Sequence, residues 1–206
     1  MLVDAHTHLD RYLHKRFGAN ITPILEQIEK HEILTISNSL DLTSYKTSKR
    51  IAKQSKFVVP AFGIHPWNAY KYVNKIGLIK RLVRRNNIIG EIGLDYHLIR
   101  DKRKYPSQRK IFRLFLSETR EKVISVQTKG AGKDVLDLLR RYGSKRVIIH
   151  WYSGSFDVLE EMIGEGYYFS ISPEIGFSKH IREIVKKIPF KQILTETDNP
   201  GVLKAI

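Results

Sequence analysis

Short apolar segments alternate with longer amphipathic segments along the chain, and this alternation constrains the fold more than any other feature. The apolar segments are rich in Ile, Val, Tyr and Phe and mostly do not alternate with polar residues, as expected for strands buried on both faces of a parallel sheet. The predicted strands are residues 2–5, 33–37, 57–62, 88–92, 123–127, 147–150, 167–171 and 192–195. The predicted helices are residues 21–31, 43–54, 76–85, 106–119, 133–142, 156–163 and 179–187.

Eight strands that alternate with seven helices predict an α/β fold of the (β/α)8 TIM barrel type. An open doubly wound sheet is the alternative. The sequence stops six residues after Pro200, so we expect a barrel that lacks its last helix or has it truncated. Such a barrel exposes one flank: either a second copy in a homodimer covers it, or the chain is a short form of the barrel. The 206 residues, 42% of them hydrophobic, suit one domain over residues 1–206.

Composition restricts the location and the partners of the chain. No apolar run is long enough to span a bilayer, and no signal peptide is recognisable, so we expect a cytoplasmic protein without a membrane partner. The sequence has no cysteine, which excludes disulfides and thiolate metal sites. The formal net charge of +15 favours a polyanion such as DNA as partner. A lysine-rich solvated surface is the alternative explanation of that charge.

Polar residues that can bind a metal follow five of the predicted strands, and in a barrel these strand ends meet at one mouth. Residues two apart on a strand share a face, so His6 and His8 can chelate one divalent cation. Glu91 lies in an apolar strand and would be costly to bury without a cation. The remaining candidates at strand ends are His65, Asp95, His150 and Asp198, with Trp67 and Trp151 beside them.

These motifs resemble the TatD family of metal-dependent deoxyribonucleases, which are amidohydrolase-like barrels. The matching segments span almost the whole chain. Their residues are closer to those of a divergent TatD-related branch than to those of the central DNases of the family. They are VDAHTHLD, AFGIHPW, IIGEIGLDY, SVQTKGA, VIIHWYSGS, GYYFSISPEIGFSK and ILTETDNP.

The resemblance implies a site for one or two divalent metal ions, with Mg²⁺, Mn²⁺ or Zn²⁺ as candidates. His6, His8 and Asp198 would hold the first ion, Glu91 would bridge to the second, and His150 would bind the second. His65 and Asp95 would line the pocket and orient a phosphate or a water, and Lys129 would meet a phosphate oxygen. Gln127 stands where the family usually has a histidine, and its neutral carbonyl is a weaker zinc ligand, which leaves the second ion open.

The function expected from this resemblance is hydrolysis of DNA phosphodiester bonds by a metal-activated water. Asp198 would act as ligand and general base, while a second metal ion, or Lys129 with His65, would stabilise charge on the phosphate. Trp67 and Trp151 would stack on bases, although they fit the wall of a small pocket equally well. Two alternatives stay open: a small-molecule amidohydrolase or phosphoesterase on the same barrel, and a degenerate barrel that acts as a nucleic-acid-binding or assembly subunit.

Overall fold

A computed structural model describes residues 2–200 and contains the alternating strands and helices that the sequence predicts. The strands are β1 (Leu2–Thr7), β2 (Ile33–Asn38), β3 (Val58–Ala61), β4 (Ile88–Gly93), β5 (Val123–Gln127), β6 (Val147–His150), β7 (Tyr168–Ile171) and β8 (Ile193–Thr195). The α-helices are α1 (Thr22–Lys30), α2 (Leu42–Ile51), α3 (Ile76–Arg84), α4 (Tyr105–Leu116), α5 (Gly132–Tyr142), α6 (Phe156–Gly164) and α7 (Lys179–Lys187).

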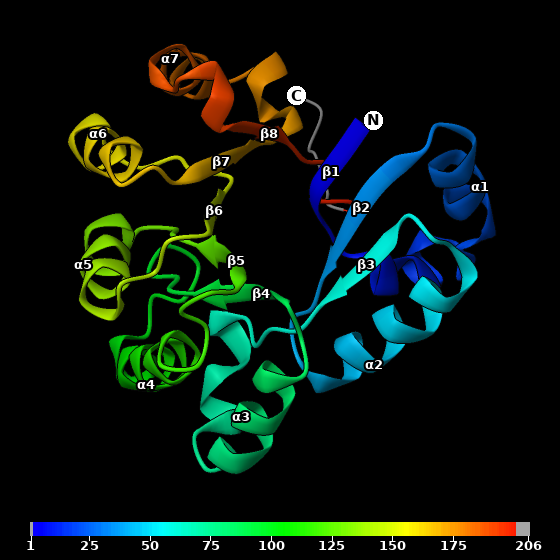
Figure 1. Cartoon of the computed structure of the whole chain (residues 1–206), viewed down its shortest axis with the longest axis horizontal. Coiled ribbons are helices and arrows are strands. Elements are labelled where there is room, and N and C mark those ends of the chain that lie inside the picture. Colours follow the sequence, from blue (N-terminus) through cyan, green and yellow to red (C-terminus); the bar gives the residue numbers. More distant parts are fainter. Residues whose placement is uncertain (1, 201–206) are drawn as a thin grey trace.

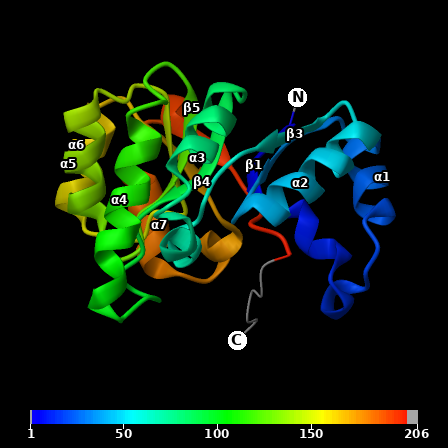
Figure 2. The same cartoon turned by 90° about the horizontal axis from the view of Figure 1, so that it is seen from below.

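The strands are all parallel and follow one another around the molecule in chain order, with the helices outside them (Figure 1). They form a three-stranded sheet of β1–β3 and a five-stranded sheet of β4–β8, which lie in the two halves seen in Figure 2. The order of the strands never reverses, so the doubly wound alternative is wrong and the arrangement is that of a TIM-like barrel.

Hydrogen bonds cross both seams between the two sheets. At the β3–β4 seam, the backbone N–H of Gly90 donates to the carbonyl of Phe62 over 3.0 Å. At the β1–β8 seam, the carboxylate of Asp4 accepts from the backbone N–H of Thr197 over 3.0 Å and from its hydroxyl over 2.7 Å. The carbonyl of His6 also accepts from the N–H of Asp198 over 2.9 Å. These contacts join the strands around the barrel near their carboxyl ends.

Short 3₁₀ helices follow several strands, and the sequence analysis did not foresee them. They are η1 (Leu9–Leu13), η2 (Lys15–Phe17), η3 (Ala52–Gln54), η4 (Pro66–Tyr72), η5 (Lys102–Lys104), η6 (Pro173–Gly176) and η7 (Phe190–Gln192). Short 3₁₀ helices carry no 3.6-residue periodicity, so a search for amphipathic segments does not find them.

A close approach between β3 and β4 depends on a glycine. A Cβ atom on Gly63 would lie 2.3 Å from the backbone nitrogen of Glu91, far inside contact distance. Only a residue without a side chain allows the segment after β3 to run this close to β4. The strand that carries Glu91 is therefore held against the end of β3.

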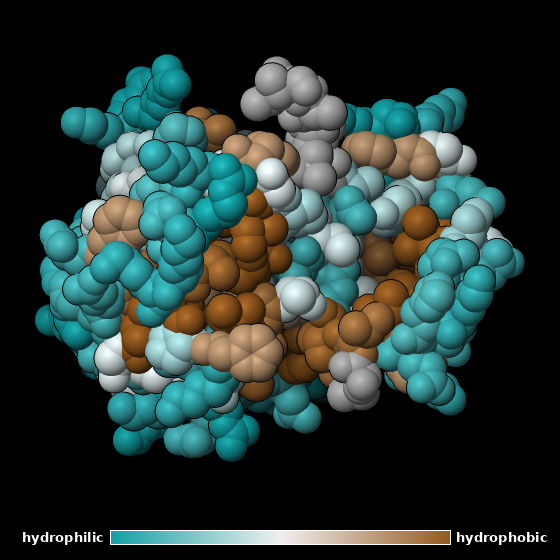
Figure 3. Space-filling view, turned by 90° about the horizontal axis from the view of Figure 1, so that it is seen from above, coloured by the Kyte–Doolittle hydropathy of each residue, from teal (hydrophilic) through white to brown (hydrophobic). Residues whose placement is uncertain are grey.

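One flank of the barrel, where β1 and β8 lie, is not covered by any helix of residues 2–200 (Figure 1). A cleft of about 320 Å³ opens there, and Val3, Ile24 and Ile33 are among its apolar lining residues. Figure 3 shows apolar side chains gathered on this face between the two halves of the molecule. The expected loss of the eighth helix concerns the chain after Pro200 and lies outside the described residues.

Within residues 2–200, none of the helices has the length and apolar character that a membrane crossing would require.

Candidate metal centre

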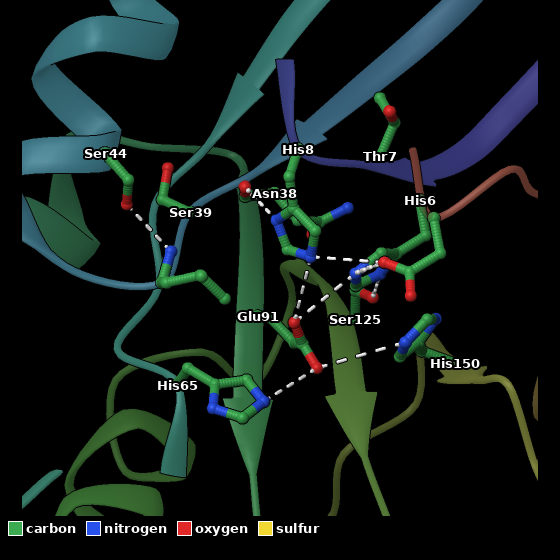
Figure 4. A network of polar contacts seen from close by, with 12 residues as sticks. His6, Thr7, His8, Asn38, Ser39, Ser44, His65, Glu91, Ser125 and His150 are labelled. Carbon is green, nitrogen blue, oxygen red and sulfur yellow. Dashed lines mark hydrogen bonds and ion pairs between the residues drawn. The ribbon is translucent and has the colours of Figure 1, made fainter. Parts of the chain in front are cut away.

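Four histidines and a glutamate meet at the carboxyl ends of the strands, in the arrangement of Figure 4. His6 and His8 project from β1 toward Glu91 of β4, with their Nε2 atoms 3.4 and 3.6 Å from Glu91 Oε2. His65, which follows β3, places Nε2 3.2 Å from the other carboxylate oxygen, Oε1. Glu91 is only 2% exposed. The carboxylate thus lies at the centre of the group, in contact with residues of both sheets.

The strands are irregular where they deliver these side chains. The register of β1 against β2 shifts between Asp4 and Thr7, and the register of β4 against β5 shifts between Ile89 and Ile92. Such irregularities bend a strand and turn its side chains away from strict alternation. They coincide with His6 and Glu91, so the local backbone directs both side chains into the barrel mouth.

Asp198 and His150 complete the cluster from the other side. Asp198 Oδ1 lies 3.3 Å from His8 Nε2 and 3.9 Å from His6 Nε2. The ring of His150 stacks on that of His6 with centroids 3.5 Å apart, and its Nε2 is 4.0 Å from Glu91 Oε1. Asp198 has a φ of 51°, in the left-handed region that is strained for a side-chain-bearing residue and typical of functional sites.

A second layer of polar groups orients three of the four clustered histidines, namely His6, His8 and His150. His6 Nδ1 lies 3.0 Å from the hydroxyl of Ser125, and His8 Nδ1 lies 3.0 Å from the carbonyl of Asn38. His150 Nδ1 lies 2.8 Å from Glu196 Oε2, and Glu196 is itself 4% exposed. With Nδ1 engaged in each ring, Nε2 faces the cluster. Ligand histidines in metal sites are fixed in this way.

The electrostatics of the cluster favour charged carboxylates. Burial opposes ionisation of Glu91, yet the surrounding His65 and His6 outweigh it and hold its pKa well below the usual value. Burial also opposes the charge on Asp198, but the hydrogen bond with His8 and the nearby His150 lower its pKa to about 2. Both carboxylates are therefore anionic acceptors at neutral pH.

The histidines respond to burial and to their neighbours in different ways. Burial, reinforced by His150, lowers the pKa of His6. Burial would also lower the pKa of His150, but the charge and hydrogen bond of Glu196 raise it to about 9. The rings thus differ in how readily they offer a neutral nitrogen.

The residues at this point fit a divalent cation. Two atoms that each lie ~2.1 Å from a tetrahedral ion are about 3.4 Å apart, and His6 and His8 lie 3.3 to 3.9 Å from the carboxylates of Glu91 and Asp198. His6 Nε2 is buried and makes no hydrogen bond of good geometry with any residue in the range 2–200. The ligand atoms of His6, His8 and Asp198 lie within 4.8 Å of one another.

Gln127 also faces this pocket from the end of β5. It is 5% exposed, lines the same cavity as His8 and Glu91, and its side-chain carbonyl has no hydrogen-bond partner among the described residues. An unpartnered buried carbonyl oxygen is costly and suits a hard cation or a water as partner.

The pocket has a volume of about 210 Å³. Its rim carries the lysine and the aromatic side chains that are predicted to contact the substrate. Lys129 Nζ lies 3.0 Å from the hydroxyl of Ser153 and 4.8 Å from the ring centre of Trp151. Burial lowers the pKa of Lys129. The indole N–H of Trp151 donates to Glu174. Lys129 and Trp151 thus form one side of the rim.

Trp67 also lines the pocket, and the buried Asp95 contacts its indole. Asp95 is fully buried, and one carboxylate oxygen accepts the indole N–H of Trp67 over 2.7 Å. The other accepts the backbone N–H groups of His97 and Leu98 over 3.0 and 2.8 Å. Asp95 does not line the pocket; its carboxylate holds the indole of Trp67, which does.

The structure adds two residues that the sequence analysis did not assign. Glu196 supports His150, and Arg11, from η1, lines the pocket beside His8. Glu196 stands in the TETDNP segment, two residues before Asp198. This place at the polar end of a predicted strand was the sequence signal that could have identified it as a site residue. Arg11 had no such signal, because it lies in a 3₁₀ turn.

Comparison with known proteins gives matches over almost the whole chain. The family model described as TatD related DNase matches residues 3–204. An uncharacterized metal-dependent hydrolase of Buchnera aphidicola is 30% identical over 210 residues, which cover 97% of this chain and 78% of the relative. The deoxyribonuclease TATDN3 of Homo sapiens is 25% identical over 218 residues, with 98% and 78% covered. The crystal structure of YJJV, a TatD homologue from Escherichia coli, superposes with a TM-score of 0.83 at 20% identity and covers 96% of this chain and 78% of that one.

Proposed function

Because this chain belongs to the family of TatD-related DNases, which are metal-dependent hydrolases, we propose that its barrel domain cleaves phosphodiester bonds of DNA. The observation that carries the proposal is the cluster of His6, His8, Glu91, His150 and Asp198 at the open end of the strands. A bound divalent cation supplies Lewis acidity, which makes a water molecule acidic enough to act as a nucleophile near neutral pH.

We assign the metal-binding role to this cluster. His6, His8 and Asp198 would hold one cation, Glu91 would bridge to a second, and His150 with Gln127 would complete the second position. Asp198 would also accept the proton of the attacking water, since its carboxylate lies beside the ligand histidines, 3.3 Å from His8 Nε2.

We assign substrate binding to the rim of the pocket. Lys129 and His65 would donate to the phosphate oxygens as negative charge develops there. Trp67, which is 40% exposed, and Trp151 flank the opening and offer faces on which bases can stack. Asp95 would fix Trp67 in place through the 2.7 Å hydrogen bond to its indole.

Two observations favour DNA over a small amide or ester substrate. The pocket is bordered by two tryptophans and two cations, Lys129 and Arg11, which suit bases and phosphates. The net charge of +15 attracts polyanions to the protein. The degenerate-barrel alternative is not favoured, since the ligand-type side chains converge within a few ångströms of one another. We place the enzyme in the cytoplasm, as expected from the sequence, and cell fractionation tests this location.

The experiment is cleavage of end-labelled single-stranded DNA with Mg²⁺ or Mn²⁺ and with EDTA. The control is a His6→Ala/His8→Ala protein, and Arg146→Ala, an exposed change before β6, controls for lost positive charge. We expect shortening that needs the metal and both histidines. Shortening by the double variant, or none by the parent, would refute the proposed activity. Salt-sensitive binding without cleavage would instead support the binding-subunit alternative.

We further propose that two copies pair through the uncovered β1–β8 flank. Leu2 lines the cleft there and is 62% exposed, and a second copy would remove such apolar surface from water. Light scattering tests this pairing. Leu2→Asp should give monomers, while Ile76→Asp, a change at an exposed apolar residue of α3, should not. A monomeric parent would refute it.

A further inference from the structure

A second cavity, which we call the side cavity, opens next to the metal pocket. Its volume is about 310 Å³, and its walls come from η1, η2, η4 and the first turn of α2. Arg11, Leu40 and Trp67 line both this cavity and the metal pocket, so the two spaces share a wall. These three residues therefore stand between the metal pocket and the side cavity.

The side cavity combines positive charge with an aromatic ring. The guanidinium carbons of Arg16 and Arg11 lie 4.6 and 5.7 Å from the ring centre of Phe17. Arg16 is exposed and Phe17 half-buried. Guanidinium groups bind phosphate oxygens, and aromatic faces stack on bases. Together with Trp67 on the shared wall, these groups match the two chemical parts of a nucleotide.

A buried carboxylate points to a ligand that also donates hydrogen bonds. Asp10 lines the side cavity, is 6% exposed, and its Oδ1 has no hydrogen-bond partner within residues 2–200. The cavity's other carboxylate, Asp41, already accepts the N–H groups of Thr43 and Ser44, each over 2.9 Å. An unpartnered buried acceptor is costly. The amino or ring N–H groups of a nucleobase would satisfy it, whereas a phosphate alone would not.

We propose that the side cavity is a subsite for the nucleotide that flanks the cleaved phosphodiester bond. Its phosphate lies at Arg11 and Arg16, its base stacks on Phe17, and an N–H group of the base donates to Asp10. This inference rests on the proposed nuclease function and deepens it. The subsite makes the enzyme selective for polynucleotides over small phosphodiesters.

The test compares two substrates for the full-length protein. One is a short single-stranded oligodeoxynucleotide, and the other is bis(4-nitrophenyl) phosphate, which is too small to reach from the metal pocket into the side cavity. The variants are Arg16→Ala and Phe17→Ala, and Phe17→Trp, which keeps an aromatic ring at this position. Arg146→Ala is the control for loss of one positive charge at the amino ends of the strands.

We expect Arg16→Ala and Phe17→Ala each to raise KM for the oligonucleotide about tenfold, as is typical for loss of a stacking or phosphate contact. Their kcat/KM on bis(4-nitrophenyl) phosphate should match that of the parent. Phe17→Trp should cleave the oligonucleotide as the parent does. Equal losses on both substrates, or no change on either, would overturn the subsite while the nuclease stands. A parent that hydrolyses only the small diester would overturn the proposed function itself.

Discussion

Replacement of Glu196 should weaken metal binding although Glu196 need not touch the ion. Its Oε2 lies 2.8 Å from Nδ1 of His150, and both side chains are almost fully buried. The carboxylate accepts a hydrogen bond from Nδ1–H and thereby directs Nε2 at the cluster around Glu91. Glu196→Gln keeps the shape and one acceptor oxygen but removes the charge. Glu196→Ala removes the acceptor altogether.

The size of the effect follows from the hydrogen bond that is lost. A bond to a charged group contributes roughly 1.5–3 kcal/mol and a neutral one about 0.5–1.5 kcal/mol. The Gln variant therefore loses about 1.4 kcal/mol, which is a factor of about 10 in affinity. The Ala variant loses about 2.7 kcal/mol, or a factor of about 100, the upper end for residues that support metal ligands.

Isothermal titration of Mn²⁺ into parent and variants measures these factors, with circular dichroism to verify the fold. Glu174→Gln is the matched control, because that carboxylate accepts the indole N–H of Trp151 and contacts no ligand histidine among the described residues. Parental Mn²⁺ affinity in the Glu196→Ala protein would refute the assignment of His150 as a ligand held by Glu196. An equally large loss of Mn²⁺ affinity in Glu174→Gln would show that any carboxylate near the mouth of the barrel has this effect.

Three further changes test other parts of the structure. Asp198→Asn should reduce DNA cleavage roughly a hundredfold or more without unfolding the chain, and unchanged turnover would remove Asp198 from the mechanism. Gln127→His should strengthen binding of a second cation in calorimetry, since Gln127 lines the metal pocket. If the stoichiometry and affinity of metal binding stay the same, Gln127 does not stand at a metal-ligand position. Tyr167→Phe should stabilise the fold by ~1 kcal/mol near neutral pH, because the Tyr167 hydroxyl is buried without a hydrogen-bond partner in the described chain. Tyr45→Phe should instead destabilise the fold by about as much, because it removes the 2.7 Å hydrogen bond to Asn86. Burial raises the pKa of Tyr167 from 10 to about 12, so the folded parent loses stability as pH rises through that range. The advantage of Tyr167→Phe in urea unfolding should therefore grow above pH ~10, and a pH-independent difference would contradict this reasoning.

The elements and their order could be predicted from the sequence because both depend on local patterns. The strands β5 (Val123–Gln127) and β6 (Val147–His150) have the predicted bounds, and most other ends differ by one or two residues. Continuous apolar runs and amphipathic periodicity report on burial directly. The convergence of His6 and Glu91 followed from the rule that parallel strands end at one mouth.

The supporting contacts could not be predicted, since they join residues distant in the chain and depend on side-chain orientation. Asp95 appeared to be a pocket residue because it follows β4, but its carboxylate turns away to hold Trp67. The pairing of His150 with Glu196 and the wall made by Arg11 depend on loop conformation. Irregular 3₁₀ turns, such as η1 and η2, leave no periodic signal in a sequence.

The two seams of the barrel have a consequence for how this chain unfolds. The three-stranded sheet contributes His6 and His8, and the five-stranded sheet contributes Glu91 and His150, so a cation at the cluster links both halves. Few backbone hydrogen bonds cross the seams, and a ligand that binds only the folded state adds to its stability. Phe62 and Ile64, which follow β3, pack in the same apolar core as the five-stranded half, so the chain should melt in one transition. A chelator that removes the metal would then lower the melting temperature of the whole chain.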